Sequence, residues 1–215
     1  MSKVYKQDNM TIHNADCMEI MAGYEDNYFD LAVVDPPYGI GASSMVMGKG
    51  KNKKYNNKKK WDNKSPSDEY FNALFRVSKN QIIWGGNYFN LPINSGWIFW
   101  DKDRNKDLSF GDGELAWCSS LNVIKKLKIK YDGFLGADDN RIHPTQKPIK
   151  LYSSIYSGYA KEGDKILDTH GGSFSNAIAA HYAKMGEFVG CELDEDYFKS
   201  ACERIRKETR QMELF

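Results

Sequence analysis

The sequence lacks any long apolar run: no segment approaches the roughly 20 residues that a membrane-spanning helix needs, and the N-terminus lacks the apolar core of a signal peptide. We therefore expect a cytoplasmic protein with no membrane partner. The four cysteines are scattered and form no C-x-x-C pair, which argues against a structural zinc site and a disulfide framework. We expect reduced thiols and no bound metal.

The composition is otherwise ordinary. The chain has 215 residues, of which 41% are hydrophobic and 27% charged, and it has no internal repeat, which indicates a single domain. The net charge of +1 conceals a basic segment, because residues 49–64 contain eight lysines and one aspartate. This segment alone carries +7 and leaves about −6 for the rest of the chain.

Alternating apolar residues predict seven short strands, with helical patterns between them. The strands are expected at 10–15, 30–35, 81–86, 96–101, 114–119, 165–169 and 188–193, and helices at 175–185, at 194–210 and from Pro148 onward. This alternation indicates an α/β fold with a mainly parallel seven-stranded sheet and helices on both faces. Ligands of such sheets bind beyond the carboxyl ends of the strands, where Asp16, Asp35, Asp168 and Glu192 are expected.

The segment DLAVVDPPYGIG leads an apolar strand into Asp35, Pro36, Pro37 and Tyr38. Prolines and acids are common in purely structural turns, but such a turn does not require these four residues together. We expect the Asp35 carboxylate and the Pro36 carbonyl to accept the two hydrogens of one amino group. Those contacts would free the lone pair of a base's exocyclic nitrogen for attack, while Tyr38 stacks on the base.

With this motif the chain resembles the S-adenosylmethionine-dependent DNA methyltransferases that modify amino groups, in which Asp-Pro-Pro-Tyr is mostly used for adenine N6. The catalytic segment, residues 10–41, precedes the matching segment 141–206, as in the beta class. The resemblance implies a permuted Rossmann-like fold, S-adenosylmethionine as cofactor, an adenine extruded from double-stranded DNA, and a restriction-modification setting. Cytosine N4, an RNA adenine, and a DNA-binding module with a degenerate cofactor site stay open as alternatives, as does a homodimer.

The segment LDTHGGSFSNA, residues 167–177, has the strand, glycines and helix that bind the polar end of a ligand. It departs from the family's Asp-Pro-Phe-x-Gly-Ser-Gly loop at Thr169, His170 and Phe174. We expect Phe174 not to adopt the positive φ that glycine permits, and therefore an altered loop or weaker cofactor binding. The residues expected at the cofactor are Asp16, Cys17, Asp35, Lys147, Asp168, His170, Gly171, Gly172, Ser173 and Glu192.

Three of these residues are predicted to have specific roles. Glu192 follows the next strand, where an acid can hold ribose hydroxyls. Asp16 reads as the N-cap of a helix, with Glu19 three residues later, and the resemblance also assigns this turn to the adenine of the cofactor. The resemblance assigns HPTQKP, residues 143–148, to the methionine end, which makes Lys147 a partner for its carboxylate.

The basic segment can be a solvated loop, but its position after the catalytic motif favours contact with DNA phosphates. The expected contacts are Lys53, Lys54, Lys58, Lys59 and Lys60. We expect one methyltransferase domain, residues 1–215, with target-contacting insertions at about 42–80 and 102–142.

Overall fold

The computed structural model describes residues 3–41, 62, 64–104, 111–131 and 141–210. The strands in this part of the chain are β1 (Lys3–Gln7), β2 (Met10–Asn14), β3 (Phe29–Val34), β4 (Ser78–Trp84), β5 (Trp97–Asp101), β6 (Gly113–Cys118), β7 (Ile124–Lys128), β8 (Lys165–Asp168) and β9 (Glu187–Cys191). The helices are α1 (Cys17–Ala22), α2 (Asp68–Val77), the short 3-10 helix η2 (Gly86–Tyr88), α3 (Ile149–Tyr159), α4 (Ser175–Tyr182) and α5 (Glu195–Arg210).

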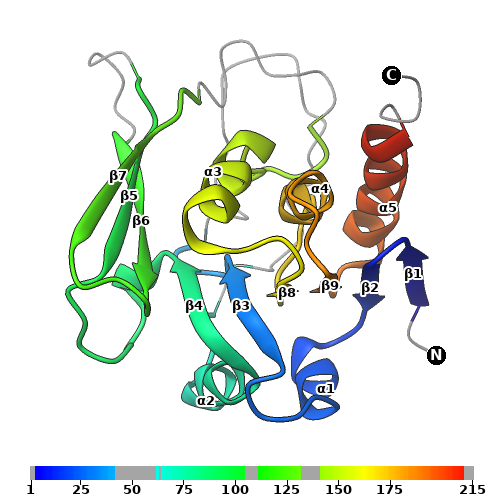
Figure 1. Ribbon diagram of the computed structural model, residues 1–215, viewed down its shortest axis with the longest axis horizontal. Coiled ribbons are helices and arrows are strands. Elements are labelled where there is room, and N and C mark those ends of the chain that lie inside the picture. The colour runs from blue at the N-terminus through cyan, green and yellow to red at the C-terminus, as the bar shows by residue number, and fades with distance from the viewer. Residues whose placement is uncertain (1–2, 42–61, 63, 105–110, 132–140, 211–215) are drawn as a thin grey trace.

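All the strands join one sheet in the order β1-β2-β9-β8-β3-β4-β6-β5-β7. The centre, from β2 to β4, is parallel, whereas β1 and β6 pair antiparallel with their inner neighbours. Helices α3, α4 and α5 cover one face, and α1 and α2 cover the other (Figure 1). These features confirm the predicted α/β fold with a mainly parallel sheet and helices on both faces.

The predicted count of seven strands is wrong, because the described residues form nine. The two additional strands, β1 and β7, lie at the two ends of the sheet. Their sequences, KVYKQ and IKKLK, are mostly exposed and rich in lysine, as is common for edge strands. They therefore lack the apolar alternation from which the other strands were predicted.

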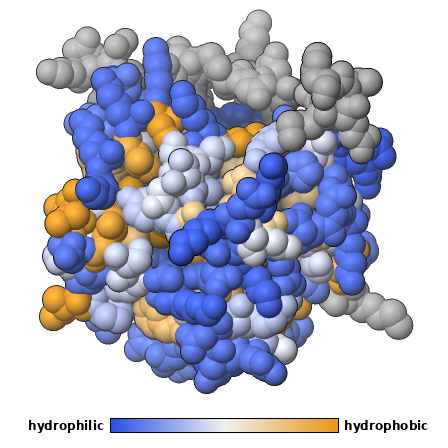
Figure 2. Space-filling model, in the orientation of Figure 1, coloured by the Kyte–Doolittle hydropathy of each residue, from blue (hydrophilic) through white to orange (hydrophobic). Residues whose placement is uncertain are grey.

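The central strands are buried on both faces, which explains their nearly continuous apolar sequences. In β3, Leu31 and Val33 pack toward α3 and α4, while Ala32 and Val34 pack toward α1 and α2. The surface in Figure 2 is mainly hydrophilic, with hydrophobic side chains gathered on the side that holds β5, β6 and β7. We call these three strands the sheet extension.

The helix predictions are confirmed, with small differences at the ends. Helix α4 ends at Tyr182 rather than at residue 185, because Lys184 adopts a left-handed φ of 52°. The ranges 42–80 and 102–142 also contribute to the fold itself. The first contains α2 and the first residues of β4, and the second contains all of β6 and β7. The target contacts expected from these ranges stay a prediction.

Candidate active site

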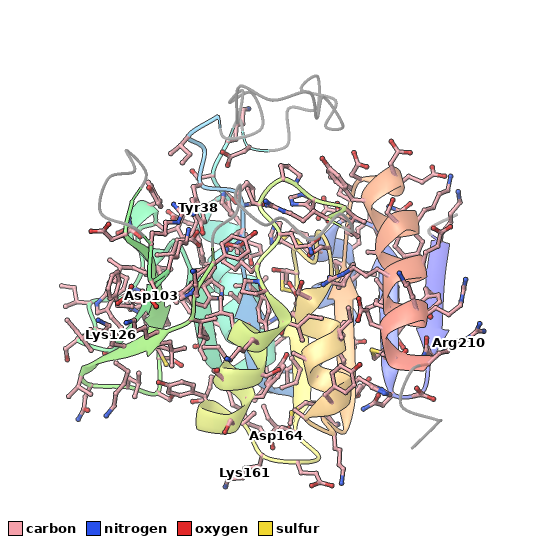
Figure 3. All side chains as sticks on the ribbon, turned by 90° about the horizontal axis from the view of Figure 1, so that it is seen from above. Tyr38, Asp103, Lys126, Lys161, Asp164 and Arg210 are labelled. Atoms are coloured by element: carbon pink, nitrogen blue, oxygen red, sulfur yellow. The ribbon has the colours of Figure 1, made fainter. Side chains whose placement is uncertain are left out.

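A pocket of about 420 Å³ lies where the carboxyl ends of β3, β8 and β9 meet the turn before α1 and the segment before α3. It brings together the predicted catalytic residues Asp35 to Tyr38 and every predicted cofactor residue except Asp168. Tyr38 lies centrally at this edge of the sheet, between the sheet extension and α5 (Figure 3). The convergence of acids predicted from strand ends therefore exists for Asp16, Asp35 and Glu192.

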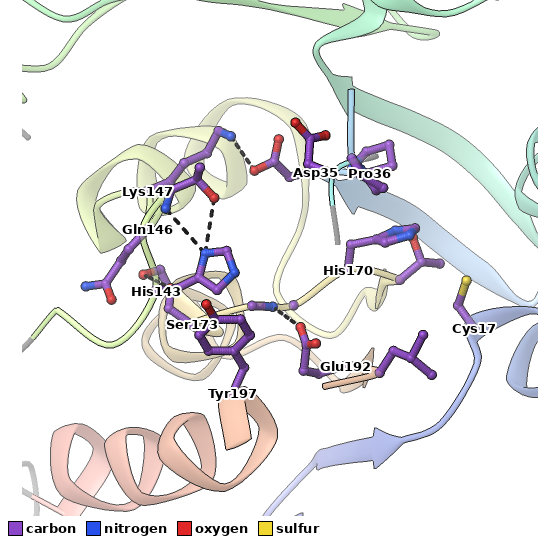
Figure 4. A pocket seen from close by; sticks show the side chains of 18 of the residues that line it. Cys17, Asp35, Pro36, His143, Gln146, Lys147, His170, Ser173, Glu192 and Tyr197 are labelled. Carbon is purple, nitrogen blue, oxygen red and sulfur yellow. Dashed lines mark hydrogen bonds and ion pairs between the residues drawn. The ribbon is translucent and has the colours of Figure 1, made fainter. Parts of the chain in front are cut away.

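Asp35 lies directly after β3, and each oxygen of its carboxylate has a partner. Its Oδ1 accepts a hydrogen bond from the Tyr38 hydroxyl at 2.8 Å, and its Oδ2 accepts one from Lys147 Nζ (Figure 4). A carboxylate offers about four lone-pair sites, so these two contacts leave room for further donors. Asp35 can therefore accept a hydrogen bond from a ligand without losing either partner.

Lys147 belongs to a chain of alternating charges that the sequence did not reveal. Its buried ammonium also lies 3.2 Å from Glu114 Oε2, and Glu114 Oε1 accepts a hydrogen bond from Lys102. We call Asp35, Lys147, Glu114 and Lys102 the charge chain. Burial opposes the charge on Lys147, but Asp35 and Glu114 outweigh it and raise the pKa of this ammonium. Lys147 is thus charged at neutral pH.

Tyr38 is held on three sides. Its ring stacks on Tyr88, with centroids 4.9 Å apart and planes at 12°, and Phe89 approaches edge-on. Gly85 has a φ of 67°, and a Cβ there would lie 2.2 Å from Tyr38 Cε1. Gly85 is therefore required for this position of Tyr38. The sequence contains Gly85-Gly86 directly after an apolar stretch, which could have indicated this close approach. The prediction instead placed both glycines inside the strand 81–86.

Residues 169–174, which we call the cofactor loop, connect β8 to α4. The Gly172 amide donates to Glu192 Oε2 at 2.8 Å, and Asp194 N donates to Glu192 Oε1 at 2.8 Å, so Glu192 is fixed by backbone groups. Gly172 itself has a φ of 52°. The backbone of the cofactor loop thus holds the Glu192 carboxylate, which lies in the pocket wall (Figure 4).

The expectation that Phe174 cannot take a positive φ is wrong, because its φ is 51° and its ψ is 35°. Its ring is fully buried and packs so tightly on Gly171 that a Cβ there would lie 2.0 Å from Phe174 Cε1. Burial of the ring compensates for the strained backbone. The loop therefore keeps a left-handed residue at this position, although the residue is not glycine.

The polar departures Thr169 and His170 are also accommodated. Thr169 Oγ1 lies 2.6 Å from the Tyr70 hydroxyl and 2.9 Å from His170 Nδ1, and the His170 ring packs edge-on against Tyr70. Burial lowers the pKa of His170 to about 4. The histidine is therefore neutral near pH 7 and provides an aromatic ring in the pocket wall.

Asp168 is buried behind the pocket. Its carboxylate accepts hydrogen bonds from the His170 amide at 3.1 Å and from Asn176 Nδ2 at 3.0 Å, and Asn176 also donates to the Val33 carbonyl at 3.0 Å. Burial raises the pKa of Asp168 to about 7, against the opposing effect of these donors. Asn176 thereby links the strand of the cofactor loop to the strand that carries Asp35.

Asp16 is the N-cap of α1, as predicted, because its Oδ1 accepts a hydrogen bond from Met18 N at 2.8 Å. Both Asp16 and its neighbour Cys17 line the pocket. Burial, with a contribution from Asp16, raises the pKa of the Cys17 thiol to about 12. Cys17 is therefore a neutral thiol.

His143 has a local role. Its Nδ1 lies 3.1 Å from Thr145 Oγ1 and accepts from Thr145 N at 3.4 Å, and its ring contacts Tyr197 edge-on, with centroids 4.4 Å apart. These contacts shape the turn that precedes α3 and delivers Lys147 to the pocket. They agree with a structural histidine rather than a base.

Lys53, Lys54, Lys58, Lys59 and Lys60 lie outside the described residues. Asp62, a described residue within the basic segment, lines the pocket and is buried. Its Oδ1 accepts a hydrogen bond from Gly39 N at 2.9 Å, and its carbonyl accepts one from Gly41 N at 3.0 Å. Residues 41 and 62 are therefore joined beside the catalytic motif.

The described ranges contain no cluster of three or more histidine, cysteine, aspartate or glutamate residues that could hold a metal ion. Among the helices seen there, none has the length and apolarity to cross a membrane.

Strand β3, which leads into the predicted catalytic motif, precedes β8 in the chain but lies beside it in the sheet. Comparison with known proteins identifies the family. Residues 81–203 match the N6_N4_Mtase family, described as DNA methylase, and this match covers more than half of the 215 residues. The chain belongs to this family, whose members use S-adenosylmethionine.

Individual relatives cover nearly the whole chain. It is 23% identical to the type II methyltransferase M2.MboI of Moraxella bovis, over 94% of this chain and 89% of that protein. The solved M1.HpyAVI complex with S-adenosylmethionine has a TM-score of 0.59 at 19% identity and covers 91% of this chain and 99% of its own. The cytosine-N4-specific PvuII DNA methyltransferase has a TM-score of 0.61 at 12% identity, with 96% and 93% covered. These structural likenesses establish the fold.

Proposed function

We propose that the protein is a site-specific DNA adenine N6-methyltransferase. The observation that carries this proposal is that Asp35, Pro36, Pro37 and Tyr38 share one pocket with the cofactor loop and Glu192. Methyl transfer requires that the methyl donor and the amino group be held together in one site, which this pocket would provide.

Asp35 is proposed to act on the target amino group. Its carboxylate has remaining acceptor capacity, so it can bind an amino hydrogen as the nitrogen lone pair leaves conjugation with the ring. S-adenosylmethionine would supply the methyl group to this nitrogen, and its sulfur would keep the electron pair of the sulfur–carbon bond that breaks. The amino group would lose one proton, and the Asp35 carboxylate is proposed to accept it. Tyr38 would contact the base after it leaves the duplex.

The cofactor is proposed to lie along Asp16, Cys17, the cofactor loop and Glu192. The Glu192 oxygens accept hydrogen bonds from the Gly172 and Asp194 amides, and a carboxylate oxygen can accept more than one hydrogen bond, so Glu192 is proposed to accept from a ribose hydroxyl as well. Lys147 has three ammonium donors, and its contacts with Asp35 and Glu114 leave capacity for the methionine carboxylate. The retained left-handed conformation of Phe174 favours a working cofactor site over a degenerate one.

Adenine is preferred to cytosine because Asp-Pro-Pro-Tyr resembles the adenine N6 form of the motif, although the similar PvuII enzyme is cytosine-N4-specific. The basic segment is proposed to bind phosphates of double-stranded DNA, and its junction at Asp62 supports a location beside the pocket. A restriction partner, a homodimer and residence in the cytoplasm stay predictions from the sequence.

Expression in a methylation-deficient host, followed by sequencing of modified bases, tests the function. We expect N6-methyladenine in one sequence context, and no such signal from an Asp35→Ala variant that still binds cofactor by calorimetry. N4-methylcytosine would refute the adenine assignment alone. Cofactor binding without any modified DNA or RNA would favour the binding-module alternative.

A further inference from the structure

Glu114 lines the pocket but comes from β6, in the sheet extension, rather than from the catalytic motif or the cofactor loop. Its Oε1 accepts from Lys102, and its Oε2 lies 3.2 Å from Lys147 Nζ. Oε2 is shielded from solvent, so its negative charge is balanced by the Lys147 ammonium rather than by water. A buried carboxylate held between two lysines at the edge of the pocket calls for a functional explanation.

The charge chain alternates in sign, so each interior charge is shared between two partners. Lys147 lies between Asp35 and Glu114, with the Trp84 ring 5.5 Å from its ammonium. Burial opposes ionisation of Glu114, but Lys147 and Lys102 outweigh it and lower the pKa of this carboxyl to about 2. Glu114 is therefore ionised at neutral pH and competes with Asp35 for the same ammonium.

This competition bears on Asp35 directly. An ammonium held only by Asp35 would draw electron density from the carboxylate and weaken it as an acceptor for the target amino group. Removing one member of a buried ion pair also leaves an uncompensated charge in a medium that screens it poorly. Glu114 counters the first effect, because it shares the Lys147 ammonium with Asp35.

We propose that Glu114 is a positioning residue for methyl transfer, which acts through Lys147 to keep Asp35 oriented and available as an acceptor. The inference rests on the proposed function and deepens it. It makes the reacting group depend on the sheet extension, since both Glu114 and Lys102 belong to it or follow it directly.

The test compares Glu114→Gln, Glu114→Asp and Lys102→Met with the parent in methyl transfer to DNA. Glu114→Gln should lower kcat about tenfold or more, with a smaller change in KM for the cofactor, and Glu114→Asp should restore part of the rate. Lys102→Met should cost less than Glu114→Gln, because Glu114 still holds Lys147. Glu195→Gln, which alters an exposed carboxylate paired with Lys3 and Lys199, is the matched control.

A second readout is the titration of the Lys147 ammonium, followed by NMR of the lysine side chains without DNA. The titratable groups around it are Asp35 after β3, Glu114 in β6, Lys102 after β5, and Tyr38 and Tyr152 close to Asp35. Loss of the Glu114 charge should lower the pKa of Lys147. The alkaline loss of activity should then begin at lower pH in Glu114→Gln than in the parent.

The outcomes separate the two proposals. An unchanged Lys147 titration, or a Glu114→Gln variant with parental kcat, would overturn the role of Glu114 and leave the proposed function intact. An equal loss in Lys102→Met and Glu114→Gln, together with equally reduced stability to urea, would show that Glu114 only supports folding. A parent protein that binds cofactor but methylates no nucleic acid would instead overturn the proposed function.

Discussion

Substitutions of Phe174 test whether the cofactor loop keeps its shape by storing backbone strain. The residue combines a φ of 51° with complete burial of its ring. The ring lies against Gly171 and Gly190, where added Cβ atoms would come within 2.0 Å and 2.4 Å of Phe174 Cε1. Burial of the ring stabilises the fold, whereas the left-handed backbone destabilises it. Substitution of Phe174 by alanine and by glycine separates these two effects.

The magnitudes follow from these two effects. Truncation of a buried phenylalanine to alanine costs about 3–5 kcal/mol of unfolding free energy. A left-handed residue with a Cβ is strained by about 1 kcal/mol or more, and alanine keeps that strain whereas glycine relieves it. Phe174→Gly should therefore be more stable than Phe174→Ala by about 1 kcal/mol, the reverse of the usual order.

Equilibrium unfolding in urea, with cofactor affinity measured by calorimetry, checks this expectation. Because Phe174 does not line the pocket, we expect both variants to lose cofactor affinity only in step with loop stability. A Phe174→Ala variant as stable as Phe174→Gly would refute the stored strain. A loss of cofactor binding in stable, folded variants would instead place the ring in contact with the ligand.

Four further predictions concern the pocket. Asp35→Ala should lower turnover on the order of 100-fold with cofactor binding retained, and more than about a tenth of the parental rate would contradict its role. Glu192→Ala should weaken cofactor binding by about 1.5–3 kcal/mol in calorimetry, and unchanged affinity would move the ribose elsewhere. Gly85→Ala should lower turnover, because its Cβ would lie 2.2 Å from Tyr38 Cε1, and a parental rate would show that Tyr38 can move freely. His170, whose folded-state pKa is about 4 against about 6.5 when unfolded, contributes stability above pH 6.5 that is lost as pH falls toward 4. His170→Phe should lack that part of the acid destabilisation in urea titrations at pH 7 and pH 4.5, and an identical pH dependence would exclude a buried neutral histidine.

Much of the fold could be predicted from the sequence because the central strands are buried on both faces. Residues 31–34 and 188–191 are without charged side chains since helices cover each side of them, and their β pattern is correspondingly clear. The edge strands β1 and β7 could not be predicted in this way. Their pairing depends on backbone hydrogen bonds to neighbours, and exposed lysines can occupy such strands without penalty.

The candidate site was predictable where acids or motifs follow strands, as for Asp35 and Glu192. Glu114 was missed because nothing local marks it: it reaches the pocket only because β6 pairs antiparallel with β4. Its ionic partners, Lys102 and Lys147, are 12 and 33 residues away in the chain. Long-range charge pairing of this kind has no sequence signature in a single chain.

The departures of the cofactor loop from the family pattern are consistent with one another. A loop that had simply decayed should leave buried polar groups without partners. Thr169 instead pairs with both Tyr70 and His170, and Asn176 holds the Asp168 carboxylate and the Val33 carbonyl. The Phe174 ring meanwhile fills the space beside Gly171 that no other side chain could share. Because Thr169 and His170 contact each other and the Phe174 ring is fully buried, the altered residues form a packed loop rather than a decayed one. Reverting one residue alone, such as Phe174 to glycine, should therefore destabilise the loop rather than improve it.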